Sequence, residues 1–235
     1  MIDRRRFLAA SAGSLGGALL AACNSDPKAA HPLLAFAEKK NETVERAIFR
    51  HRSMDRVAAD AKLSGTAFPQ YYVADELPIW DPGVRGVWRL EVSGAIRKPL
   101  SLTLDDLQKF PRRSQVVDHF CVEGWNARAK WTGVRLSDLA NAAELTPDAG
   151  YVDFRSFDDN YHESWDIESA MHPQTLVAYA MDGHYLGAGH GAPARVHSPV
   201  KLGYKNTKYL TSIVFMPRKN GGYWSDQGYE WYGGT

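Results

Sequence analysis

The sequence has few cysteines, almost no net charge and no long hydrophobic run. Only Cys23 and Cys121 occur among its 235 residues, which excludes a disulfide framework. The formal net charge of +1 gives no basis for a nucleic-acid partner. The longest apolar run, residues 9–22, is shorter than the about 20 residues of a membrane-spanning helix. With 44% hydrophobic residues, the composition is that of an ordinary globular protein.

Residues 1–22 are predicted to be an export signal. Arginines at positions 4–6 precede an apolar run of small residues, the pattern of a secretory signal. Residues 4–8, Arg-Arg-Arg-Phe-Leu, resemble the twin-arginine export motif, and residues 20–23, Leu-Ala-Ala-Cys, resemble a bacterial lipobox. We therefore expect cleavage before Cys23, lipidation of Cys23, and a periplasmic protein held at the membrane only by this lipid.

The pattern of the mature chain predicts an α+β fold that is mostly β, with mixed sheets and short helices. Residues 23–40 are predicted to be a tether. A helix is predicted over residues 41–65, capped by Asn41, because apolar residues recur there at helical spacing: Val44, Ala47, Ile48, Val57, Ala58 and Ala61. Residues 66–235 are expected to form one domain. It shows no regular alternation of strands and helices, which favours the α+β class.

Within that domain, strands are expected at 87–92, 114–121, 151–157 and 211–216, from their apolar alternation. Residues 176–181 and 184–186 should form a hairpin around Asp182-Gly183. Short helices should follow Thr103 and span 136–143, the second capped by Ser137. The aromatic, glycine-rich tail 221–232 is predicted to cover the core or a sheet edge; the alternative is a partner surface.

Cys121 is the predicted centre of the functional site. An unpaired thiol is a liability in an oxidising compartment, which suggests that this one has a role. A thiolate suits a transition metal, but the eight histidines show no zinc-type spacing. Any remaining metal ligands are therefore expected from an organic cofactor. His119 lies two residues before Cys121 and should share its strand face.

Three motifs in order resemble the molybdenum-cofactor domain of the sulfite oxidase family. They are CVEGW at 121–125 with WTGVRLSDL at 131–139, LVAYAMDG at 176–183 with HGAPAR at 190–195, and GYKNTKY at 203–209. The resemblance extends from about Phe68 to the end. It is nearest to the bacterial periplasmic molybdopterin oxidoreductases, a branch that includes the catalytic subunit of protein-methionine-sulfoxide reductase.

The resemblance implies a molybdenum atom held by one molybdopterin and by the Cys121 thiolate. His119 and Glu123 would join Cys121 in the catalytic pocket, where Glu123 either handles protons or forms a hydrogen bond within its loop. The implied cofactor-binding residues are Gln70, Tyr71, Tyr72, Cys121, Ser156, His190, Arg195, Asn206, Thr207 and Lys208. Without the resemblance, Lys201, Lys205 and Lys208 would be interpreted as a solvated strand face.

The implied reaction is a two-electron oxygen-atom transfer on an S-oxide or a sulfite-like substrate, either a small molecule or an oxidised protein. Sulfite is disfavoured because Arg128 is the only arginine that closely follows Cys121. The sequence lacks the Cys-x-x-Cys-His motif of attached haem, so a separate redox partner is expected, such as a cytochrome or a membrane haem protein.

Two other classes remain open from the residues. A periplasmic cysteine hydrolase or transpeptidase would use Cys121 as nucleophile and a histidine such as His119 as base. A non-catalytic binding lipoprotein would use neither residue chemically.

The lipobox prediction is tested by labelling the full chain with a radioactive fatty acid in a bacterial host. Label should enter the wild-type protein and be absent from Cys23→Ala, because the lipid bonds to this thiol. Cys121→Ala serves as the matched control and should keep the label. Label retained in Cys23→Ala would contradict the anchor.

Overall fold

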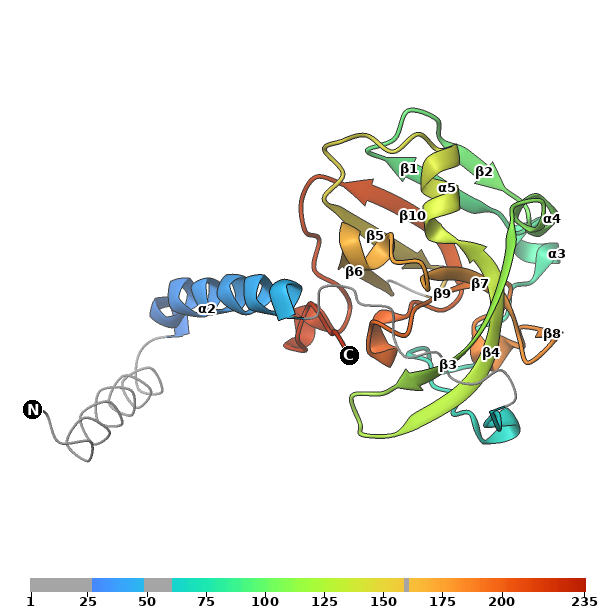
Figure 1. Cartoon of the computed structure of the whole chain (residues 1–235), viewed down its shortest axis with the longest axis horizontal. Helices are drawn as coiled ribbons and strands as arrows, with labels where there is room; N and C mark the ends of the chain where they lie inside the picture. Colours follow the sequence, from blue (N-terminus) through green and yellow to red (C-terminus); the bar gives the residue numbers. More distant parts are fainter. Residues whose placement is uncertain (1–26, 49–60, 159–160) are drawn as a thin grey trace, which may run out of the picture. The chain divides into compact units, whose positions relative to one another are not determined.

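The computed structural model describes residues 27–48, 61–158 and 161–235 (Figure 1). The chain divides into two units, residues 1–48 and 49–235. The predicted export signal, the predicted anchor Cys23, and Val57 and Ala58 of the predicted helix lie outside the described residues.

Helix α2 (Pro27–Ile48) is the element described in the first unit. It begins at Pro27, so the predicted helix start at Asn41 is wrong, and residues 27–40 of the predicted tether are helical. Alanine and other strong helix formers are frequent in this stretch, and proline is tolerated in the first turn of a helix. Residues 61–64 have no regular structure, so the predicted helix does not extend to 65. No helix in the described ranges is both long and apolar enough to cross a bilayer.

The second unit is built on two five-stranded sheets (Figure 1). The first sheet has the order β2 (Leu100–Leu102), β1 (Leu90–Gly94), β10 (Leu210–Met216), β5 (Tyr151–Ser156), β6 (His162–Asp166). The second has the order β3 (Arg112–Phe120), β4 (Asn126–Arg135), β7 (Leu176–Met181), β8 (His184–Tyr185), with β9 (Arg195–His197) also paired to β7. Only β1 and β10 pair in parallel among these strands. The predicted α+β fold, mostly β with mixed pairing, is confirmed.

Short helices occupy the connections between strands. They are α3 (Pro82–Arg85), α4 (Leu104–Gln108), α5 (Leu136–Ala142), α6 (Ile167–Ala170), and the 3-10 turns η1 (Gly65–Ala67), η2 (Ala188–His190), η3 (Gly203–Lys205) and η4 (Ser225–Gln227). Thr103 caps α4 through a capping box with Asp106, as predicted. Ser137 does not cap α5, because that helix already begins at Leu136, whose side chain is fully buried.

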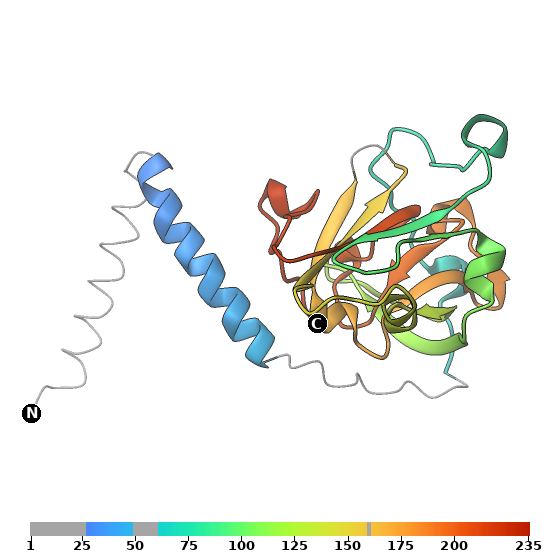
Figure 2. The same ribbon diagram turned by 90° about the horizontal axis from the view of Figure 1, so that it is seen from above.

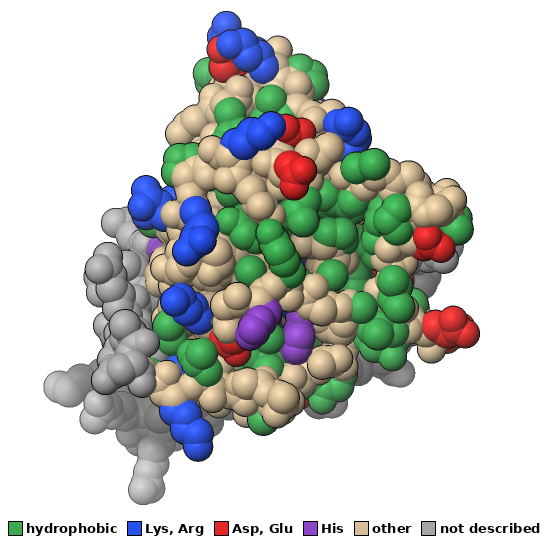
Figure 3. Space-filling view, turned by 90° about the vertical axis from the view of Figure 1, so that its right-hand side faces the viewer, with side chains coloured by type: hydrophobic (Ala, Val, Ile, Leu, Met, Phe, Trp, Pro, Cys, Tyr) green, Lys and Arg blue, Asp and Glu red, His purple; other side chains and the backbone are tan. Residues whose placement is uncertain are grey.

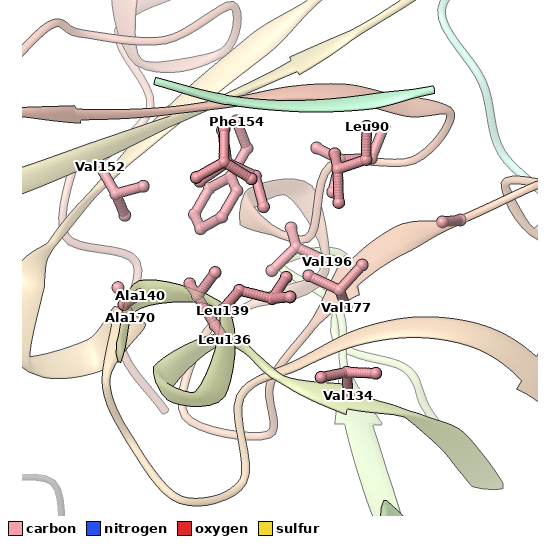
Figure 4. Packing of buried hydrophobic residues seen from close by; sticks show 14 of the residues in the cluster. Leu90, Val134, Leu136, Leu139, Ala140, Val152, Phe154, Ala170, Val177 and Val196 are labelled. Carbon is pink, nitrogen blue, oxygen red and sulfur yellow. The ribbon is translucent and has the colours of Figure 1, made fainter. Parts of the chain in front are cut away.

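The larger cluster of buried hydrophobic residues takes side chains from both sheets and from α5. Figure 2 shows the sheets from above. Side chains of the first sheet, such as Phe154, point toward Leu136 and Leu139 of α5 and Val177 of β7 (Figure 4). Each of these residues is fully buried, so its burial contributes roughly 1.5–3 kcal/mol to folding. On the face shown in Figure 3, hydrophobic side chains gather at the centre and right, and Lys and Arg lie mostly toward the top and left.

The predicted strands agree with β1, β3, β5 and β10, although β1 begins at Leu90 instead of residue 87. Both partners of β1 pair with it only from Leu90 or Glu91 onward, and Val87 is exposed. The predicted 176–186 hairpin is present as β7 and β8. Strand β4 was missed because Asn, Arg, Lys and Gly interrupt its apolar pattern, yet it pairs with both β3 and β7.

The C-terminal tail covers the outer edge of β6. The backbone N–H of Ser164 donates to the carbonyl of Gly221 at 3.2 Å, and that of Tyr223 donates to the carbonyl of His162 at 2.8 Å. Further on, Trp231 and Tyr232 are buried. The predicted edge-covering role of the tail is confirmed.

Gly133 should be essential to the second sheet, because a Cβ at this position would collide with the Val177 carbonyl across the β4–β7 pair. We expect Gly133→Ala to reduce the free energy of unfolding by about 2 kcal/mol. Gly187→Ala is the matched control, since its Cβ would meet nothing within 4 Å, and it should change stability by less than about 0.5 kcal/mol. Equal midpoints for the two variants in urea denaturation would contradict this packing.

Candidate functional site

One cavity of about 350 Å³ opens beside the turn between β3 and β4. Its walls come from the 68–73 loop, the β3–β4 turn, β9, η3 and the tail. Predicted site residues on the walls are Tyr71, Tyr72, His119, Cys121, Glu123, Arg195, Asn206 and Lys208. Phe68, Trp125, Tyr161, Tyr204, Trp224 and Tyr229 add an aromatic lining.

The CVEGW motif forms the tight turn that presents the thiol. The backbone N–H of Cys121 donates to the carbonyl of Trp125 at 2.9 Å, and Gly124 donates back to Cys121 at 3.0 Å. Gly124 has φ +87°, a left-handed conformation that favours glycine. Burial raises the pKa of the Cys121 thiol.

Glu123 is bound within this turn. Its Oε2 accepts a hydrogen bond from the Trp125 indole at 3.0 Å and lies 3.8 Å from the Cys121 sulfur. Of the two interpretations of Glu123, a hydrogen bond within the loop is therefore the one observed. The carboxylate also lines the cavity, so a part in proton handling stays a prediction.

His119 is a buried, neutral part of the wall. Its Nδ1 lies 3.3 Å from Nε2 of His197, and its ring stacks on Trp125 with centroids 5.9 Å apart. Burial, reinforced by the charges of Arg195 and Lys208, lowers the pKa of His119 to about 3. Gly203 leaves room for the ring, because a Cβ there would lie 2.7 Å from its Nε2.

The thiol and His119 do not form a nucleophile–base pair. Among the described residues, the only hydrogen-bond partner recorded for the Cys121 sulfur is Glu123. The hydrolase alternative requires a base within hydrogen-bond reach of the nucleophile, and His119 is instead bonded to His197. The geometry gives this alternative no support.

Arg195 and Lys208 place positive charge against the cavity. The buried Arg195 guanidinium donates to the carbonyls of His190 at 3.2 Å and Asn206 at 3.1 Å. Lys208 Nζ donates to the carbonyls of Tyr71 at 2.5 Å and Gly189 at 2.6 Å. None of the described carboxylates forms an ion pair with either side chain. Both cations are thus left with charge to offer a ligand.

Desolvation is the main effect on these two cations. Burial lowers the pKa of Lys208 to about 7, an effect to which the nearby Arg195 charge adds. Burial likewise lowers the pKa of Arg195 to about 10. An anion bound between them would restore both values.

The remaining predicted cofactor residues are not all on the cavity wall. Gln70 Nε2 lies 3.5 Å from His190 Nε2, next to the loop that holds Lys208. The side-chain amide of Asn206 bonds to the backbone: its oxygen accepts from the N–H of Ser198, and its nitrogen donates to the carbonyls of Lys201 and Leu202. Thr207 is buried and Ser156 bonds to Asp158, and neither lines the cavity. Cofactor binding by these residues stays a prediction.

Lys201 and Lys205 are not on a solvated strand face, which corrects that interpretation. Lys201 donates to Asp166 at 2.8 Å and Lys205 to Glu163 at 2.5 Å, and all four side chains are fully buried. The tail covers this segment and excludes water. Local sequence gives no sign of this, because the acidic partners lie in β6.

Sequence reasoning also missed His197 and the aromatic rings that the tail adds to the cavity wall. Trp224 and Tyr229 belong to the tail, for which only a covering role was predicted. The high density of aromatic residues in 223–232 is the one local signal that could have suggested a cavity wall.

The residues present fit an anionic, sulfur-bearing metal cofactor. A half-buried thiol offers a soft ligand at one side of the cavity, and Arg195 and Lys208 offer charge-assisted hydrogen bonds to phosphate. No group of three or more His, Cys, Asp or Glu side chains gathers to hold a metal ion within the described residues. Cys121 alone would therefore complete a metal already held by its cofactor.

The family comparison agrees with this chemistry. The family described as the oxidoreductase molybdopterin binding domain matches residues 77–224. The chain therefore belongs to this family of sulfite oxidase-like, molybdopterin-dependent oxidoreductases, and molybdopterin with molybdenum is its cofactor.

Two similar proteins carry related names. The "Putative protein-methionine-sulfoxide reductase subunit YedZ1" of Azospira oryzae is 36% identical over 234 residues, covering 99% of this chain and 88% of the relative. The catalytic subunit of protein-methionine-sulfoxide reductase of Ralstonia nicotianae is 28% identical, covering 92% of this chain and 70% of that subunit.

The sulfane dehydrogenase SoxCD of Paracoccus pantotrophus is a similar solved structure. The match covers 56% of this chain and 38% of the SoxCD chain, with a TM-score of 0.53 and 24% sequence identity. This similarity supports the fold alone.

The thiol and the phosphate-facing cation should both be needed to retain the cofactor. We expect Cys121→Ala to lower the molybdenum content of the purified protein from about one per chain. Lys208→Met should weaken retention more than tenfold, because a charge-assisted hydrogen bond contributes about 2 kcal/mol. Metal and pterin analysis after gel filtration measures both.

Arg128→Met is the matched control for this experiment. Arg128 pairs with Asp118 at 2.8 Å outside the cavity, so its loss should leave the metal content unchanged. Full molybdenum content in both Cys121→Ala and Lys208→Met would contradict the assigned site.

Proposed function

We propose that this protein is a periplasmic, lipid-anchored reductase that removes the oxygen atom from a neutral S-oxide such as methionine sulfoxide, free or within an oxidised protein. The observation that carries the proposal is that the described lining of the cavity holds no cation beyond Arg195 and Lys208. Arg128 is bound at 2.8 and 3.0 Å to both carboxylate oxygens of Asp118. Arg195 and Lys208 are the cations that fit the cofactor phosphate.

The cavity chemistry suits a neutral, partly apolar substrate. Aromatic rings make up much of the lining, and the neutral His119 can form one hydrogen bond without adding charge. Sulfite carries charge that these walls would leave without a partner, at a cost of several kcal/mol.

The bound cofactor supplies two-electron redox chemistry and oxygen-atom transfer. The overall reaction takes two electrons and two protons, breaks the S–O bond, and releases a thioether and water. Within it, Cys121 holds the metal side of the cofactor, and Arg195 and Lys208 hold its phosphate side. The aromatic rings exclude water from the reacting sulfur.

The names of the relatives from Azospira oryzae and Ralstonia nicotianae support an S-oxide as substrate. Electrons would come from a separate carrier, a cytochrome or a membrane haem protein. The sequence of residues 1–23 supports export and a lipid anchor.

The test is a paired assay of the molybdenum-loaded protein. Reduced viologen should be oxidised in the presence of methionine sulfoxide, and ferricyanide should not be reduced by sulfite. Cys121→Ala should lose the first activity, whereas Arg128→Met should keep it, because that arginine is already paired. Sulfite oxidation faster than sulfoxide reduction would contradict the proposal.

A further inference from the structure

The tail reaches the cavity through a turn that is tied to the first sheet. One oxygen of the buried Glu163 carboxylate accepts from the backbone N–H of Trp224 at 2.9 Å. The other accepts from Lys205 Nζ at 2.5 Å and from Ser225 Oγ at 3.3 Å. This carboxylate therefore joins β6, η3 and the start of η4.

The chain then turns back so that two rings stand together. Gly228 adopts φ +97°, and the N–H of Tyr229 donates to the carbonyl of Trp224 at 3.1 Å. The rings of Trp224 and Tyr229 lie 5.1 Å apart, and Tyr229 lies 5.5 Å from Tyr204. All three line the cavity, so the tail and η3 together form an aromatic part of its wall.

Tyr229 is a partly exposed residue of the cavity wall. It is 40% exposed while lining the cavity, a combination that puts it at the mouth, as for Val122 beside Cys121. Tyr229 also lies beyond residues 77–224, the part that matches the family. Cys121, Arg195 and Lys208 lie within that matched part, whereas Tyr229 lies outside it.

From this arrangement we propose that the Trp224–Tyr229 wall selects the substrate by contacting an apolar group carried on the sulfoxide sulfur. The inference rests on the proposed function and names the substrates it favours, sulfoxides with a large apolar substituent. The contact is assigned to the ring of Tyr229, because this ring forms part of the cavity wall.

The experiment compares methyl phenyl sulfoxide with dimethyl sulfoxide on the molybdenum-loaded protein. Tyr229→Ala should raise KM for methyl phenyl sulfoxide about tenfold more than KM for dimethyl sulfoxide, the effect of a small change in apolar contact. Tyr229→Phe should restore the wild-type ratio because it keeps the ring. Tyr185→Ala, an exposed tyrosine of β8 outside the cavity, is the matched control and should leave the ratio unchanged.

Binding measured without turnover separates this inference from the proposed function. Calorimetry on the oxidised protein, with no electron donor, gives Kd for methyl phenyl sulfoxide, and Tyr229→Ala should raise it about tenfold. If Tyr229→Ala weakens binding but the protein does not reduce the sulfoxide, the proposed reductase function is overturned and the role of the Trp224–Tyr229 wall is supported. Reduction with an unchanged KM ratio in Tyr229→Ala would overturn the wall alone. If the protein neither binds nor reduces the sulfoxide, both proposals are overturned.

Discussion

The burial of positive charge in residues 195–208 is the constraint on which the rest of the structure depends. An unpaired buried cation costs several kcal/mol, so each one requires a partner from elsewhere in the fold. Lys201 and Lys205 obtain carboxylates from β6. Among the described residues, Arg195 and Lys208 bond to backbone carbonyls in place of carboxylates, and both face the cavity. The first pair holds the fold together, and the second leaves charge available for an anionic cofactor.

The same constraint explains why the tail matters. Lys201 Nζ also donates to the carbonyl of Tyr232 at 2.6 Å, so the ion pair with Asp166 fixes the end of the chain as well as β6. The Glu163 carboxylate fixes the start of η4. A segment that covers a sheet edge is thereby held rigidly enough to form a cavity wall. The buried ion pairs of Lys201 and Lys205 therefore stabilise both the fold and the part of the cavity wall that the tail forms.

The site combines short-range and long-range features. The β3–β4 turn places Cys121, Glu123 and Trp125 by local hydrogen bonds, so the motif is informative by itself. His119 depends instead on His197 from β9 and on the space left at Gly203. Lys208 depends on carbonyls of Tyr71 and Gly189, far from it in the chain. Residue type alone suggests that the side chains of His119 and Lys208 lie in solvent.

Sequence alone determined the α+β class, the hairpin at Asp182-Gly183 and the Thr103 cap, because each depends on residues close together in the chain. It also predicted a role for Cys121. Three ordered motifs were enough to indicate the cofactor. Tertiary structure decided that β4 is central, that α5 begins at Leu136 and that Lys201 and Lys205 are buried. It also decided that the tail lines the cavity. These outcomes depend on burial and on pairing between distant segments, where the free energy of a buried ion pair or strand outweighs local preference.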